Sequence, residues 1–451
     1  MSQHFSLGQS RAQWATSGFM VAMTVAMLTT PWLLERYGYR RTYVGCMLVL
    51  MAGGIGGGLA NHFALVLVAR VVEGLAAGMV QPIPAIIIMR AFEPHEQGRA
   101  SGLFGMGVVL APAIGPSVGG VLVDLFGWRS IFFMVVPLCL LSLWMAMRYV
   151  PDAAPSGAPA DRHGQMIDWR GLLLATAGTL CLLNGMVALQ GGGQGGNRPA
   201  AFMLLGAALA ALLAFLAWQR RLQATGRTPL LNLALFGNRP FAMGSVVAFI
   251  YGTALFGSTY LLPVYMQLGL NLSASHAGTV LLPAGIVLAG TIAGVGRLAD
   301  RKPTWLLVST GLGLLAASFA LMATLSLASG LWLLALWTVL GRIGLGFVLP
   351  SLNLGSLRPL DPALVAQGAS AISFMRMLGG AIGVSLCGIV LEWRLAAHGD
   401  SLALAASSPA RLAAFNEAFL MLAALCLMAM AAASQLRVPP EPRPLSHLTK
   451  E

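Results

Sequence analysis

Long apolar runs separated by short polar segments make up most of the chain. Two of them, at 175–188 and 200–218, contain no charged residue. A helix that crosses the hydrocarbon core of a bilayer needs about 20 apolar residues, and the runs with their apolar flanks reach that length. The pattern predicts thirteen spanning helices, at 12–34, 42–60, 63–89, 100–123, 130–149, 170–190, 200–219, 240–266, 276–296, 305–325, 331–355, 367–391 and 415–435. We therefore expect an all-α polytopic membrane protein.

The composition excludes a large soluble enzyme. Of 451 residues, 57% are hydrophobic and only 9% are charged, whereas soluble domains carry about 25% charged residues. The sequence contains no metal-ligand spacing, activated nucleophile or phosphate-binding loop, so we expect no enzyme activity, no cofactor and no metal. The five cysteines are widely separated within apolar segments, which favours packing over a disulfide framework.

Positive charge is distributed unevenly between the two sides of the predicted membrane protein. If segment 35–41 is cytoplasmic, the cytoplasmic segments hold 19 Lys and Arg residues and the opposite side holds 5. Because Lys and Arg collect in cytoplasmic loops, we expect an inner-membrane protein with a cytoplasmic C-terminus. The net charge of +12 is then explained by topology, and no nucleic-acid partner is expected.

Several short motifs recur in the same order, 265 to 270 residues apart. The pairs are Leu34-Glu35-Arg36 with Ala299-Asp300-Arg301, Gly78 and Pro82 with Gly346 and Pro350, Gln97-Gly98 with Gln367-Gly368, and Ala113-Ile114-Gly115 with Ala381-Ile382-Gly383. Two parallel halves are typical of a large class of secondary transporters. The repeat predicts two pseudo-symmetric six-helix bundles with two inserted helices between them.

The spacing of the repeat places the partner of helix 240–266 before Met1. We therefore expect the visible first half to lack its first helix. The predicted domains are an N-terminal bundle at 1–150, a linker with two inserted helices at 151–239, a C-terminal bundle at 240–436 and a cytoplasmic tail at 437–451.

Two charged loops are candidate gates. Mixed charges in a tight turn can lock two helix ends through ion pairs and helix-dipole contacts. The alternative is an ordinary positively charged cytoplasmic loop. The candidate residues are Glu35, Arg36, Gly38, Arg40 and Arg41 in the first loop, and Asp300 and Arg301 in its repeat.

An acid and a base lie within one predicted membrane helix. Arg70 and Glu73 are three residues apart and so share a helix face. Because a charge in mid-membrane costs about 2.5–3.5 kcal/mol on insertion scales, each is expected to neutralise the other. A pair whose acid can be protonated is a candidate for proton coupling. The alternative is a static pair that orients the helix.

Helix 100–123 combines glycines with prolines. Pro bends a helix, and glycines four residues apart allow close packing against a neighbour. We expect a bent helix that seals one side of the transporter. The residues concerned are Gly107, Pro112, Gly115, Pro116, Gly119 and Gly120.

A substrate cavity is expected between the two halves. Arg376, like Arg342, is a cation within a predicted membrane helix that either binds anionic groups or reaches an interface. For each of the other cavity candidates the alternative is ordinary packing. These candidates are Tyr251, Tyr260, Tyr265, Gln267, Asn353 and Phe374.

With these motifs the sequence resembles the major facilitator superfamily, and within it the fourteen-spanner drug:proton antiporters of the EmrB/QacA type. Segment 35–41 resembles the family's loop motif, although Glu35 stands where the family has Asp and Trp32 where it has Gly. Arg70 and Gly74 match its membrane Arg motif, and segment 107–120 matches its antiporter motif. The resemblance implies a small-molecule substrate, protons as the coupling ion, and the lipid bilayer as environment.

The implied function is proton-coupled export of amphipathic or cationic organic compounds by alternating access. A periplasmic adaptor protein is left open as a partner. Two alternatives also stay open. One is a metabolite or nutrient transporter of the same fold, and the other is a non-transporting membrane receptor or a degenerate fragment.

Overall fold

The computed structural model is helical throughout the residues it describes, which are 9–150, 166–190, 198–326, 329–400 and 408–437. The side chains of residues 9–13, 109–117, 120 and 274–275 lie outside this description. Within it, eleven helices are long and apolar enough to cross a membrane, and no strand occurs. The predicted all-α membrane fold is therefore confirmed.

The first group of helices follows the predicted segments closely. Gly38 adopts φ 80° between α2 and α3, a conformation that glycine takes readily. Pro82 separates α4 from α5, since proline cannot donate the helical hydrogen bond. The elements are α1 (Gln9–Ala26), the 3-10 turn η1 (Met27–Thr29), α2 (Thr30–Tyr37), α3 (Tyr39–Gly58), α4 (Phe63–Val80), α5 (Ile83–Ala91), α6 (Gln97–Phe126) and α7 (Ser130–Tyr149).

The remaining elements include the inserted pair and the second group. They are α8 (Trp169–Gln190), α9 (Arg198–Ala224), η2 (Leu233–Gly237), α10 (Arg239–Val264), η3 (Tyr265–Gly269), α11 (Ala274–Ala299), α12 (Thr304–Met322), α13 (Leu331–Leu357), η4 (Pro362–Leu364), α14 (Val365–Ala397) and α15 (Pro409–Ala433). All thirteen predicted segments are helical. The last two boundaries were wrong, because α14 continues to Ala397 and a Ser408 cap followed by Pro409 starts α15 early.

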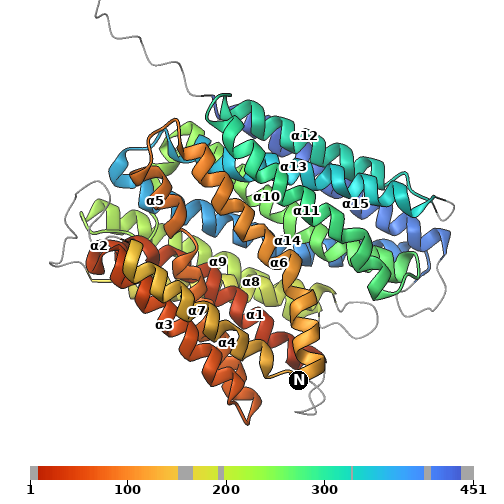
Figure 1. Ribbon diagram of the computed structural model, residues 1–451, viewed down its shortest axis with the longest axis horizontal. Coiled ribbons are helices and arrows are strands. Elements are labelled where there is room, and N and C mark those ends of the chain that lie inside the picture. The colour runs from red at the N-terminus through yellow and green to blue at the C-terminus, as the bar shows by residue number, and fades with distance from the viewer. Residues whose placement is uncertain (1–8, 151–165, 191–197, 327–328, 401–407, 438–451) are drawn as a thin grey trace, which may run out of the picture.

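The helices form two groups with α6 and α14 between them (Figure 1). In the first group α1 packs on α4, and α3 packs on both α4 and α7. In the second group α11 packs on α13, and α12 packs on both α13 and α15. The same pattern of neighbours therefore recurs in both groups.

Glycines of the sequence repeat occupy matching places in the two groups. A Cβ added at Gly78 of α4 would strike the backbone of α1 at Met23, and one added at Gly346 of α13 would lie 2.8 Å from Thr291 of α11. The lack of a side chain thus allows close packing at both sites.

The groups differ around α6 and α14. In the second group α10 packs along α14, where a Cβ added at Gly383 would lie 2.6 Å from the Thr253 Cα atom. In the described part of the first group no helix holds the equivalent place along α6, which instead packs on α11. The expectation that the first half lacks its first helix stays a prediction.

Candidate transport site and gate

The predicted ion pair in α4 forms. Arg70 Nη1 lies 2.8 Å from Glu73 Oε2, and the Glu73 side chain is only 3% exposed. The Arg70 guanidinium also lies over the Phe19 ring of α1, 4.4 Å from its centroid, a cation–π contact that stabilises the charge. Residues from two helices therefore hold the Arg70 end of the pair.

The second oxygen of the Glu73 carboxylate is buried and, within the described residues, has no hydrogen-bond partner. The neighbouring surface comes from α3, where Cβ atoms added at Gly53 and Gly54 would approach the Glu73 side chain. A buried carboxylate oxygen without a partner is costly, and protonation of the carboxyl lowers that cost because it removes the negative charge. The pair therefore stays a candidate for proton uptake and release. The sequence signal for the α3 contact, Gly53-Gly54, was missed in the sequence analysis.

Asp300 forms a latch between the two groups. Its Oδ1 accepts a hydrogen bond from the Gly98 backbone N–H at 2.6 Å, and its Oδ2 accepts one from the Arg99 N–H at 2.9 Å. The first N–H groups of a helix have no partner within the helix itself, so at the start of α6 they are free to bind Asp300. The helix dipole also favours a negative charge at this end. We call this arrangement, completed by Arg358, the Asp300 latch.

Arg358 joins the Asp300 latch from the end of α13. Its Nη2 lies 3.6 Å from Asp300 Oδ1, its Nε donates to Gln97 Oε1 at 3.0 Å, and its Nη2 donates to the Pro94 carbonyl at 2.6 Å. Burial lowers the pKa of the Arg358 guanidinium, and the Asp300 carboxylate partly offsets this. Because an Arg side chain stays charged in proteins, the latch remains ionic.

The first predicted gate loop makes contacts of a different kind. Arg36 lies near the rings of Trp32 and Tyr37, and Arg40 Nε donates to the Val150 carbonyl at 2.6 Å. Arg41 is exposed, so these positive side chains lie along the end of the first group.

Glu35 is the acid of the first loop, and Asp300 and Arg301 belong to the repeat loop. Glu35 lines a small pocket together with Gln367 of α14, and Gly38 makes the turn described above. Arg301 is exposed, and only its neighbour Asp300 enters the latch. Of the two predicted gate acids, Asp300 contacts the N-terminus of α6, and Glu35 lines the small pocket.

Helix α6 runs unbroken through the predicted antiporter motif. The side chains of Pro112, Gly115, Pro116 and Gly120 lie outside the described residues, and no described atom lies within 4 Å of a Cβ added at Gly107 or Gly119. Close packing of α6 occurs nearer its start. A Cβ added at Gly102 would lie 2.9 Å from both the Gly296 Cα atom and the Ile292 carbonyl oxygen of α11. The spacing of Gly98 and Gly102, four residues apart, is the sequence signal for this contact, but the contact was not predicted.

The predicted cavity residues are dispersed. Tyr265 is fully buried against Phe415 and Phe419, and Gln267 is exposed beyond α10. Asn353 lines a small pocket between α5, α6 and α13. Tyr260 is half-buried in α10 and Phe374 is buried in α14.

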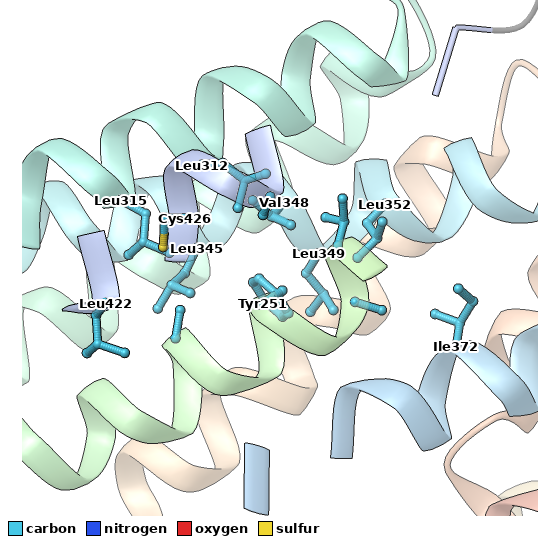
Figure 2. Close-up of a cluster of buried hydrophobic side chains, with 14 of the residues drawn as sticks. Tyr251, Leu312, Leu315, Leu345, Val348, Leu349, Leu352, Ile372, Leu422 and Cys426 are labelled. Atoms are coloured by element: carbon cyan, nitrogen blue, oxygen red, sulfur yellow. The ribbon is translucent and has the colours of Figure 1, made fainter. Parts of the chain in front are cut away.

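The other two cavity candidates come together with Arg342. Tyr251 of α10 is 1% exposed and belongs to the buried cluster that includes Leu345 and Leu349 of α13 (Figure 2). A Cβ added at the neighbouring Gly252 would lie 1.9 Å from the Arg376 carbonyl oxygen of α14, and Arg342 lies one turn before Leu345 on α13. The second group therefore brings α10, α13 and α14 together around Tyr251.

A further charged cluster lies near the end of α14. Arg394 donates two hydrogen bonds to the Glu417 carboxylate of α15, and His398 Nε2 lies 3.4 Å from the same carboxylate. The cluster was not predicted, because predicted segment 367–391 ends before Arg394 and predicted segment 415–435 begins only two residues before Glu417. In the described part of the chain, no group of three His, Cys, Asp or Glu residues is arranged to hold a metal ion.

Comparison with known proteins decides the family. The Major Facilitator Superfamily model matches residues 1–384. The chain belongs to this superfamily. It is 30% identical over 406 residues to a multidrug resistance protein B homolog of Mycobacterium tuberculosis (strain CDC 1551 / Oshkosh), covering 89% of this chain and 73% of that protein. It is 29% identical over 398 residues to the tetracenomycin C resistance and export protein of Streptomyces glaucescens, covering 87% and 70%.

Solved structures agree on the fold. The E. coli fucose:proton symporter superposes with a TM-score of 0.64 at 12% identity, covering 97% of this chain and 93% of that one. The human organic anion transporter MFSD10 superposes with a TM-score of 0.63 at 15% identity, covering 94% and 83%. This is a multi-pass membrane transporter with multidrug-resistance relatives, and not an enzyme.

Proposed function

We propose that this transporter is a proton-coupled exporter of amphipathic organic compounds, with the Arg70–Glu73 pair as its coupling element. The observation that carries the proposal is the buried Glu73 carboxylate, which has one oxygen bound by Arg70 and one without a partner in the described residues. Protonation frees Arg70 from its charged partner, and deprotonation restores the pair. The multidrug-resistance and tetracenomycin-export relatives support the direction of transport.

The Asp300 latch supplies the second element of an alternating-access cycle. It joins α6 of the first group to α11 and α13 of the second, at the end that the distribution of Lys and Arg predicts to be cytoplasmic. We propose that the latch closes the cytoplasmic side and separates when the transporter opens inward. Substrate then enters from the cytoplasm or inner leaflet, and leaves when the opposite side opens.

One proton per cycle provides enough energy for useful export. A proton that moves down a gradient of about 150 mV supplies about 3.5 kcal/mol. This free energy sustains roughly a 300-fold concentration ratio of substrate. A single titrating carboxyl in the first group is therefore sufficient.

The test is substrate-driven proton movement in liposomes that contain the purified protein and a pH-sensitive dye. Addition of a panel of amphipathic dyes to the wild-type protein is expected to release protons. Glu73→Gln is expected to abolish proton release while the protein still folds, because the amide keeps the shape but cannot carry the charge change. An exposed acid, Glu96→Gln, is the matched control and is expected to behave as wild type.

The outcomes separate the open alternatives. Proton release by sugars or amino acids, with none by the dyes, would favour a metabolite transporter. Dye binding without any proton or dye flux would favour a receptor. Normal proton coupling in Glu73→Gln at every pH would remove Glu73 from the mechanism.

A further inference from the structure

Two arginines inside the second group have no acidic partner among the described residues. Neither Arg342 of α13 nor Arg376 of α14 makes an ion pair or a hydrogen bond there. The same group does pair another buried arginine, because Arg411 Nη2 lies 3.2 Å from Asp400 Oδ1. Within the described residues, Arg342 and Arg376 therefore lack the kind of carboxylate partner that Arg411 has.

The two arginines lie far from both ends of their helices. Arg342 follows Leu331, the start of α13, by eleven residues, and Arg376 follows Val365, the start of α14, by eleven residues. At 1.5 Å per residue, each lies about 16 Å from the nearer end, close to the middle of a hydrocarbon core about 30 Å thick. A position this deep argues against the alternative that these side chains reach an interface.

The guanidinium groups of both arginines keep accessible surface. Each side chain is half-buried, and none of its nitrogens is among the inaccessible side-chain atoms that lack a hydrogen-bond partner in the described residues. Because both residues lie near the middle of the membrane, we infer that this surface faces a space between the helices. A charged group in such a position can meet a ligand.

The two arginines lie on helices that meet around Tyr251 of α10. A Cβ added at Gly252, next to Tyr251, would lie 1.9 Å from the Arg376 carbonyl oxygen of α14, and α10 also packs on α13. On α13, Leu345 and Leu349 share a helix face with Arg342, and on α14, Ile372 shares one with Arg376. Figure 2 shows these three apolar residues and Tyr251 in one buried cluster. The site therefore combines two positive charges and a hydroxyl with an apolar wall.

We propose that Arg342 and Arg376 together bind the anionic group of the transported compound, so that the preferred substrates are amphipathic organic anions. The inference rests on the proposed function, whose substrate class it narrows. A carboxylate or sulfonate accepts the forked hydrogen bonds that a guanidinium offers, and the apolar part of the compound packs on Leu345, Leu349 and Ile372. Two like charges near each other in a low dielectric repel, and the anion relieves this repulsion. The cationic compounds that the family resemblance suggested would instead be repelled.

The test compares two fluorescent probes that share one skeleton. 8-Anilinonaphthalene-1-sulfonate carries a negative charge, and N-phenyl-1-naphthylamine is the same skeleton without the sulfonate. Equilibrium binding is measured by fluorescence with the purified protein in nanodiscs of phosphatidylcholine, without any gradient. Arg342→Gln and Arg376→Gln are each expected to weaken binding of the sulfonate roughly tenfold to hundredfold, and to leave the affinity for the uncharged probe within about twofold.

Two further variants control for fold and geometry. Arg220→Gln removes an exposed charge of the same type and is expected to leave both affinities unchanged. Arg376→Lys keeps the charge but loses the planar fork, so its affinity for the sulfonate is expected to lie between those of the wild type and Arg376→Gln. A variant that loses affinity for both probes equally has only a structural defect, which would contradict the proposal.

Three other outcomes would overturn the inference. The first is equal affinity for the sulfonate in the wild type and in both Gln variants. The second is displacement of the sulfonate by phosphatidylglycerol in the nanodiscs, which would assign the site to a lipid headgroup. The third is tighter binding of the cation ethidium than of the sulfonate. The proposed function is tested separately, because binding without proton release would contradict coupling and leave the anion site standing.

Discussion

The two groups of helices hold their buried charges in different ways. In the first group Arg70 and Glu73 lie on one helix and neutralise each other at 2.8 Å. In the second group Arg342 and Arg376 lie on different helices and have no acidic partner among the described residues. The acid of a neutralised pair can bind and release a proton, whereas two positive charges without an acidic partner can bind an anion. Under the proposed mechanism, coupling and substrate recognition are divided between the two halves.

Two arginines related by the sequence repeat show a similar contrast near the ends of the helices. Arg358 binds Gln97 and Asp300 and so joins the two groups. Arg90, which precedes it by 268 residues, donates instead to the Tyr39 hydroxyl of its own group and to the Pro362 carbonyl. The Oε1 of Gln367, the repeat partner of Gln97, is buried without a hydrogen-bond partner in the described residues. Arg358 therefore takes part in the Asp300 latch, whereas Arg90 at the repeat-related position has other partners.

The largest predicted effect is the loss of stability when the Arg70–Glu73 ion pair is broken. Arg70→Ala leaves the Glu73 carboxylate buried without its partner, a change that typically costs about 3–5 kcal/mol. We expect a large fall in the thermal unfolding temperature in detergent and a low amount of protein in the membrane. Arg342→Ala removes a charge that has no described partner, so its unfolding temperature is expected to equal or exceed that of the wild type.

A double variant checks the reason for the first effect. Arg70→Ala combined with Glu73→Gln has no unpaired charge, so it is expected to recover most of the lost stability. Equal destabilisation by Arg70→Ala and Arg342→Ala would contradict the distinction between the two halves.

The next effect concerns the contact between α6 and α11. Gly102→Val places a branched side chain against the backbone of α11 at Gly296, and overpacking typically costs about 1–3 kcal/mol. We expect this variant to shift the balance away from the latched state by roughly 5- to 150-fold and to export poorly. Gly119→Val, where no described atom lies within 4 Å of an added Cβ, is the matched control.

Efflux rate and membrane abundance must be measured together for this pair. Normal abundance with lost efflux in Gly102→Val, and normal efflux in Gly119→Val, is the expected result. If Gly119→Val were the more damaging change, the gate would lie further along α6, within the predicted antiporter motif.

The smallest effect distinguishes the two repeat-related arginines. Arg358→Gln removes an ion pair and two hydrogen bonds from a partly buried latch, which we expect to weaken it by about 1–1.5 kcal/mol. Arg90→Gln removes two contacts, one of them exposed, and its expected effect is below about 1 kcal/mol. The readout is maleimide labelling of a cysteine at Ser101, which is 6% exposed beside the latch, in a background without the five native cysteines.

Labelling is expected to become about tenfold faster in Arg358→Gln and less than about fivefold faster in Arg90→Gln. Equal acceleration in the two variants would show that both symmetric positions contribute to closure.

Much of the fold was predictable from local sequence. The apolar runs located every membrane-length helix of the described residues, and the errors came at ends such as Ala397 and Pro409, where a helix extends beyond its most apolar part. The Arg70–Glu73 pair was also predictable, because residues three apart on one helix meet whatever the rest of the fold does. Asp300 was predicted as a gate residue, but its contact with the start of α6 was not predicted.

The sequence alone determined the helices, the uneven distribution of Lys and Arg between the two sides, and the pair that forms within one turn. These follow from the period of the α-helix and from the cost of placing charge in lipid. Only the tertiary structure decided that Asp300 accepts hydrogen bonds from Gly98 and Arg99, some 200 residues away. It also decided that α13 and α14, which carry Arg342 and Arg376, both pack on α10, which carries Tyr251. Such contacts depend on how far each helix is rotated and shifted against its neighbours, and packing between helices sets both.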